Sequence, residues 1–65
     1  MDIVARVKVV CSDNTSSEER IFILVVPDDT NLASCAIRLA QRDSENKWLR
    51  YAASVEDFWP IDYCL

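Results

Sequence analysis

Hydrophobic and polar positions alternate near the start of the chain, as they do in a strand with one buried face. Every odd position in Ile3–Cys11 is apolar, while Arg6 and Lys8 fall on even positions. A second apolar run, Arg20–Val26, is rich in β-branched and aromatic residues and is apolar on both faces. Because the polar segment 13–19 between them is turn-prone, the two strands are predicted to form a hairpin.

The apolar spacing becomes helical after Pro27. Side chains of residues 28–31 can accept hydrogen bonds from the free amides of a first helical turn. Over Leu32–Arg42 the apolar residues fill a wide arc and leave a narrow polar stripe, which predicts a helix lying flat on a sheet. Alternation returns over Lys47–Val55, the expected third strand. The aromatic tail that follows contains Pro60, which favours a short turn or an edge strand packed onto the body.

These elements predict one small α+β domain over residues 1–65, with the order ββαβ. We expect one antiparallel or mixed sheet of three to four strands, a single helix on one face, and a structured C-terminal tail. The strand order stays open at this point. An entirely apolar second strand favours a central position, whereas hairpin topologies often place the first strand centrally.

Composition narrows the function. The 65 residues include no Gly and no His, which excludes glycine-dependent phosphate loops, His-containing metal sites and the usual Ser or Cys nucleophiles activated by imidazole. We interpret Cys11, Cys35 and Cys64, which form no C-x-x-C pair, as reduced packing residues. We therefore expect no enzyme activity and no cofactor or metal. Without a signal peptide or an apolar run long enough to span a bilayer, we expect a cytoplasmic protein without membrane association.

Acidic residues outnumber basic ones by 11 to 7, giving a formal net charge of -4. If the chain reverses at every connection, these acids gather at two ends of the sheet. The lower pole, our candidate partner-binding surface, collects Asp2, Asp28, Asp29, Glu56, Asp57 and Asp62. The upper pole, a secondary acidic cluster beside Arg20 and Lys47, collects Asp13, Glu18, Glu19, Asp43 and Glu45. Focused negative potential attracts basic partners, although acids also collect in the loops of any acidic protein.

Two further surfaces follow from the pattern. A single helix covers one sheet face, so the other face is covered either by the aromatic tail folding back or by a dimer or partner contact. Separately, Arg6, Lys8 and Arg50 beside Trp48 are similar in kind to sheet surfaces that stack single-stranded nucleic acid. With so few cations against eleven carboxylates, we expect no direct nucleic-acid binding.

The strand Arg20–Pro27, the helix Leu32–Arg42 and the strand ending at Glu56 resemble the short ββαβ accessory proteins of phages and mobile elements. In size, acidity and lack of catalytic residues, the chain is similar to anti-CRISPR proteins. We expect a monomer or weak homodimer, in the cytoplasm of the host cell if the protein is encoded by a phage. Such a protein would block a Lys/Arg-rich nucleic-acid-binding complex by steric occlusion or DNA mimicry. The alternatives are an antitoxin or transcription-accessory module acting by dimerisation or partner capture, and a small sheet-surface nucleic-acid binder.

Overall fold

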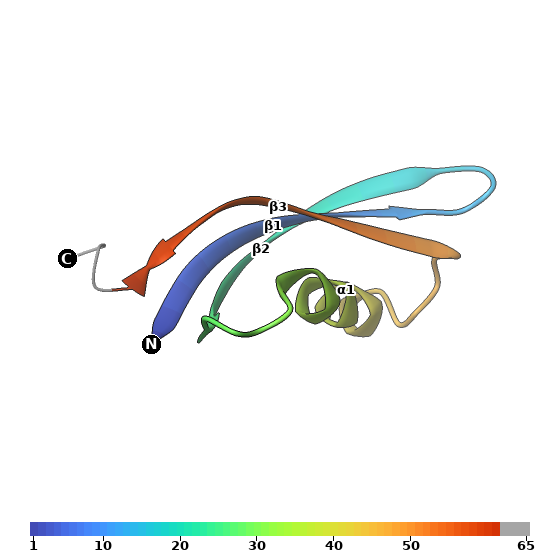
Figure 1. Cartoon of the computed structure of the whole chain (residues 1–65). Helices are drawn as coiled ribbons and strands as arrows, with labels where there is room; N and C mark the ends of the chain where they lie inside the picture. The colour runs from blue at the N-terminus through green and yellow to red at the C-terminus, as the bar shows by residue number, and fades with distance from the viewer. Residues whose placement is uncertain (62–65) are drawn as a thin grey trace.

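The structure, a computed structural model, describes residues 1–61 as one antiparallel sheet with a single helix lying against one of its faces (Figure 1). The elements follow one another as β1 (Asp2–Ser12), β2 (Ser17–Pro27), α1 (Leu32–Asp43) and β3 (Arg50–Pro60). The predicted α+β class and the order ββαβ are confirmed, and the sheet has three strands over the described residues.

The strand order is β2-β1-β3, which puts β1 in the centre and leaves β2 and β3 as the two edges. The hairpin pairs β1 with β2, and α1 then carries the chain across to the other side of β1. Val7 of β1 therefore lies opposite Phe22 on one side and Val55 on the other. The apolar character of β2 does not come from a central position, so the first of the two alternatives above, a central second strand, is wrong.

The helix α1 has well-defined ends. Asn31 caps its start, because its side-chain oxygen accepts a hydrogen bond of 3.0 Å from the backbone amide of Ser34. After the helix, Glu45 and Asn46 adopt positive φ values of 56° and 58°. Glycine is the usual residue in this left-handed region. Because the chain contains none, these two residues form the turn in its place.

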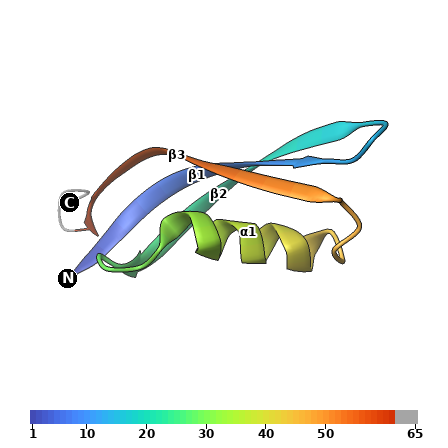
Figure 2. The ribbon, with the colours of Figure 1, turned by 45° about the vertical axis from the view of Figure 1, so that its right-hand side comes forward.

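The core lies between the helix and the sheet face formed by the odd positions of β1. Ala36 and Ala40 of α1 are fully buried, and their small side chains allow the helix to approach the sheet closely. The buried apolar residues are Ala5, Val7, Val9, Cys11, Leu24, Ala36, Ala40 and Trp48. A helix of this length spans about 18 Å, whereas an 11-residue strand spans about 36 Å. The helix therefore covers only part of one face, and the β1–β2 hairpin extends beyond it (Figure 2).

The third strand is displaced from its predicted position. It begins at Arg50 instead of Lys47 and continues through residues 56–60, which were expected to form a separate tail. A β-bulge explains why the continuation beyond Val55 was not predicted. Neighbours Arg6 and Val7 of β1 lie opposite Asp57 and Val55, so Glu56 is an extra residue in β3. An extra residue reverses the alternation beyond it, which hides the continuation of the strand from a period-of-two pattern.

Candidate interaction surfaces

The lower pole is smaller than the sequence predicts. Asp2 begins β1 opposite Pro27, and the Asp28 amide donates a hydrogen bond of 3.0 Å to the carbonyl of Met1, so Asp2, Asp28 and Asp29 lie at one end of the sheet. All three are exposed. Asp62 lies outside the described residues. The lower pole as the structure describes it therefore consists of three carboxylates.

Glu56 and Asp57 do not belong to this pole, which corrects their predicted placement. Asp57 lies opposite Arg6, four positions along β1 from Asp2, or about 13 Å away. It forms an ion pair with Arg6 at 2.6 Å, and Glu56 lies 3.7 Å from the Lys8 ammonium. The Asp57 contact also raises the pKa of Arg6, first through its hydrogen bond and then through its charge. The prediction failed because the strand continues past Val55, so both acids lie within the sheet beside basic partners.

The upper pole combines acids with cations. Asp13 accepts hydrogen bonds from the backbone amides of Thr15 and Ser16 at 2.9 and 2.8 Å, and these bonds hold its pKa below the ordinary value. Glu18 forms an ion pair with Arg20 at 2.7 Å, while Glu19 is exposed. The remaining acids, Asp43 and Glu45, line one shallow pocket together with Arg20, Ser44 and Lys47. The predicted residues do share one end of the molecule. Arg20 and Lys47 lie among them, so the electrostatic potential at this end is not uniformly negative.

The face of the sheet opposite α1 is open. Its apolar side chains are concentrated on β2, where Ile21, Ile23 and Val25 are 53%, 61% and 57% exposed. Phe58 and Trp59 of the predicted covering tail are instead part of β3. Trp59 lies opposite Val4 on the open face, whereas Phe58 lies opposite Ala5, whose side chain faces the helix. No element within residues 1–61 folds back over this face (Figure 2). The expectation that these residues would cover it is wrong; Tyr63 lies outside the described part.

The two edges of the sheet differ in how well they resist pairing with another strand. Bulges, charged residues and Pro protect natural sheet edges. The β3 edge has a bulge at Glu56 and the charge of Asp57 within the strand, and it ends at Pro60 as β2 ends at Pro27. The β2 edge has six consecutive apolar residues, from Ile21 to Val26, and Pro27 only at its end. Sequence reasoning missed this edge, although six uncharged positions in an outer strand are the pattern that identifies it.

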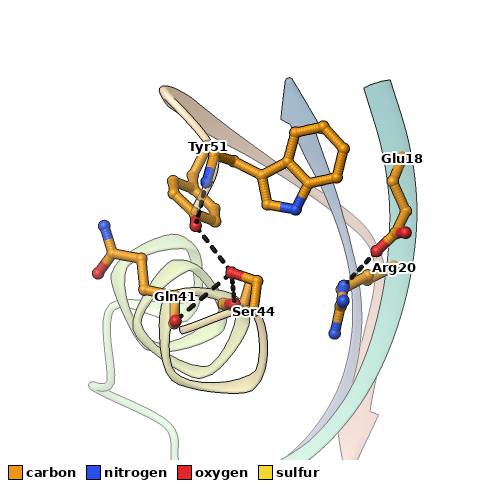
Figure 3. A network of polar contacts seen from close by, with 7 residues as sticks. Glu18, Arg20, Gln41, Ser44 and Tyr51 are labelled. Carbon is orange, nitrogen blue, oxygen red and sulfur yellow. Dashed lines mark hydrogen bonds and ion pairs between the residues drawn. The ribbon is translucent and has the colours of Figure 1, made fainter. Parts of the chain in front are cut away.

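A polar network fastens the end of α1 to β3 (Figure 3). The Ser44 hydroxyl donates to the carbonyl of Ala40 at 2.8 Å and lies 2.8 Å from the Tyr51 hydroxyl. Tyr51 in turn accepts a hydrogen bond of 3.3 Å from the backbone amide of Trp48. Since the single Ser44 proton goes to Ala40, the Tyr51 hydroxyl donates to Ser44. Hydrogen-bond donation therefore has one direction along the network: Trp48 donates to Tyr51, Tyr51 donates to Ser44, and Ser44 donates to the helix.

Trp48 is not on the outer sheet surface where the nucleic-acid alternative needs it. It is 9% exposed and packs in the core beneath the helix, and its indole N–H has no hydrogen-bond partner among the described residues. Arg6 and Lys8 do lie on the open face, but they pair with Asp57 and Glu56. The expected combination of a stacking Trp48 with free cations is therefore not assembled.

The described thiols lie in packed or partly covered positions. Cys11 is fully buried and its pKa is raised mainly by burial, in keeping with its interpretation as a packing residue. Cys35 is half-buried on α1, and both thiols are free; Cys64 lies outside the described residues. No group of three acidic or Cys side chains within residues 1–61 is arranged to hold a metal ion. In the same range, α1 is too short to cross a membrane.

Comparison with known proteins identified no protein similar to this chain. No protein-family model matches the chain, and the searches of curated proteins and of solved structures found no match. The function must therefore be argued from the surfaces described above.

Proposed function

We propose that this protein is a non-enzymatic interaction module that acts by self-association through the exposed apolar row on its outer strand β2. The single observation that supports the proposal is the row formed by Ile21, Ile23 and Val25, each more than half exposed on one side of β2. Monomeric proteins rarely leave such contiguous apolar surface in water, and a larger exposed patch is typical of a binding site. This proposal corresponds to the alternative of an antitoxin or transcription-accessory module that acts by dimerisation or partner capture.

The distribution of charge supports an apolar contact over an acidic one. Glu56 and Asp57, two of the six acids that the sequence assigned to the lower pole, lie next to cations on the sheet, and the upper pole contains both signs. The apolar row on β2 includes no charged residue between Arg20 and Asp28. An anti-CRISPR-like blockade of a basic nucleic-acid-binding complex stays a prediction of the sequence, supported by the exposed Asp2, Asp28 and Asp29.

Sedimentation velocity over a range of protein concentrations tests the proposal. We expect a monomer–dimer equilibrium that Ile23→Lys abolishes, because it places a like charge from each copy at the centre of an apolar contact. Leu49→Lys is the matched control, since Leu49 is 69% exposed but lies outside the sheet. A wild-type chain that stays monomeric, or equal effects of the two lysine variants, would refute the proposal.

Salt separates this function from the acidic alternative. Two copies with a net charge of -4 each repel one another, so added salt should strengthen self-association. Binding of acidic side chains to a basic partner weakens with salt. Dimerisation that weakened as salt was added would argue against an apolar contact.

A further inference from the structure

We propose that two copies associate by pairing β2 with β2 in antiparallel orientation, which joins their sheets into one six-stranded sheet with Ile23 beside the two-fold axis. This inference rests on the proposed function and specifies how the copies meet.

The hairpin hydrogen bonds show which residues of β2 direct their backbone outward. The Asp13 amide donates to Ser16 at one end of the hairpin, and the Asp28 amide donates to Met1 at the other, both at 3.0 Å. Hydrogen-bonded and non-hydrogen-bonded pairs alternate along an antiparallel ladder. At both ends of the hairpin, the residue on the β2 side of the bonded pair has an even number. The alternation between bonded and non-bonded pairs is therefore unbroken along the whole of β2. Even residues of β2 therefore bond to β1, and the odd residues direct their N–H and C=O groups to the free edge.

The outward backbone groups belong to the residues with the exposed apolar side chains. Ile21, Ile23 and Val25 are all odd, and all lie on the open face. A strand added at this edge obtains backbone donors, backbone acceptors and apolar side-chain contacts from the same three residues. Such strand addition is an established form of recognition at a sheet edge. The protected edge of β3 does not offer this combination.

Self-complementarity identifies a second copy as the occupant. With Ile23 opposite itself, Ile21 lies opposite Val25, so the three exposed apolar residues of β2 pair only with one another, while Val26 lies opposite Arg20. A shift of the axis to Phe22 places Glu19 opposite Val25, and a shift to Leu24 places Ile21 opposite Pro27, which has no N–H. A two-fold interface of this kind is closed, since each copy uses its β2 edge once.

Charges at the ends of the pairing agree with this register. Across the axis, Glu18 lies opposite Asp28 of the other copy, and Arg20 is the diagonal neighbour of that Asp28 on the same face. Long side chains reach diagonal neighbours across paired strands. Arg20 already binds Glu18 through its Nε atom at 2.7 Å, so it lies between two carboxylates that would otherwise repel. The register therefore places a cation at each end of an otherwise apolar contact.

Replacement of Ile23 by proline tests the edge directly. Ile23→Pro removes an outward N–H and leaves the ladder to β1 intact, so the variant should fold. The dimer loses one hydrogen bond from each copy, about 2 kcal/mol in all, which corresponds to about thirtyfold weaker dimerisation. Ser54→Lys on β3 is the control and should dimerise normally. Circular dichroism checks that each variant is folded before its dissociation constant is measured by sedimentation.

A charge exchange tests the register. Arg20→Asp should weaken the dimer, because it leaves Glu18 and Asp28 of the other copy facing one another with no cation beside them. Adding Asp28→Arg should recover it, because the new cation then lies directly opposite Glu18. If Ile23→Lys abolishes association but neither Ile23→Pro nor Arg20→Asp weakens it, edge pairing is wrong and the copies meet face to face, while the proposed function stands. A wild-type chain that stays monomeric overturns both the proposed self-association and the proposed pairing of β2 with β2.

Discussion

Loss of the Tyr51 hydroxyl should destabilise the protein strongly for so small a change. Tyr51→Phe removes two of the four bonds in the network, the one accepted from Trp48 and the one donated to Ser44. A typical hydrogen bond contributes about 1 kcal/mol net, so the variant should lose about 2 kcal/mol. A domain of this size has a total stability of about 3–10 kcal/mol. The melting temperature should therefore fall by about 8–16 °C.

A double-mutant cycle isolates the bond between the two hydroxyls. Ser44→Ala removes the bonds of the Ser44 hydroxyl to Ala40, Gln41 and Tyr51, and only the bond to Tyr51 is shared with Tyr51→Phe. The double variant should thus be about 1 kcal/mol more stable than the sum of the single losses implies. Urea denaturation followed by tryptophan fluorescence measures all four proteins. Ser54→Ala, an exposed serine on the sheet, is the control and should change little. A loss under about 0.5 kcal/mol for Tyr51→Phe, or zero coupling, would refute the directional network.

Two other predictions concern titratable groups. Folding lowers the pKa of Asp13, so its contribution is present above the unfolded value of about 3.9 and is lost as the pH falls through the folded value. Asp13→Asn should therefore lower the melting temperature at neutral pH and have a smaller effect in acid; melts at both pH values check this, and an equal difference at both would contradict it. Cys11, buried and with a raised pKa, should react with iodoacetamide much more slowly than Cys35, as peptide mapping by mass spectrometry would show. Equal rates would place Cys11 within reach of solvent.

The sequence predicted the elements whose periodicity is unbroken. The helix ends within one residue of its predicted end, and β1 and β2 include the predicted runs. β3 was misplaced because the bulge at Glu56 reverses the alternation, and a bulge depends on the partner strand rather than on any local signal. That one error moved Glu56 and Asp57 to the wrong surface.

The candidate site was harder to predict because pairing depends on register. Charge counting found the acids but could not show that Arg6 lies opposite Asp57. The open face was predicted as a possibility, since one helix covers one face. The strand order, which the sequence left open, places the exposed apolar row of the open face on an outer strand, β2. A pattern of two apolar faces on β2 is compatible with a central strand and with an adhesive edge, and only the fold distinguishes them.

The unequal edges of the sheet determine how far assembly can proceed. Were both edges adhesive, each added copy would present a fresh strand, and the chains would polymerise into fibres. The bulge at Glu56 and the charge of Asp57 disfavour this growth at the β3 edge. In the proposed dimer the β2 edges of both copies would be occupied, so assembly would stop at two copies.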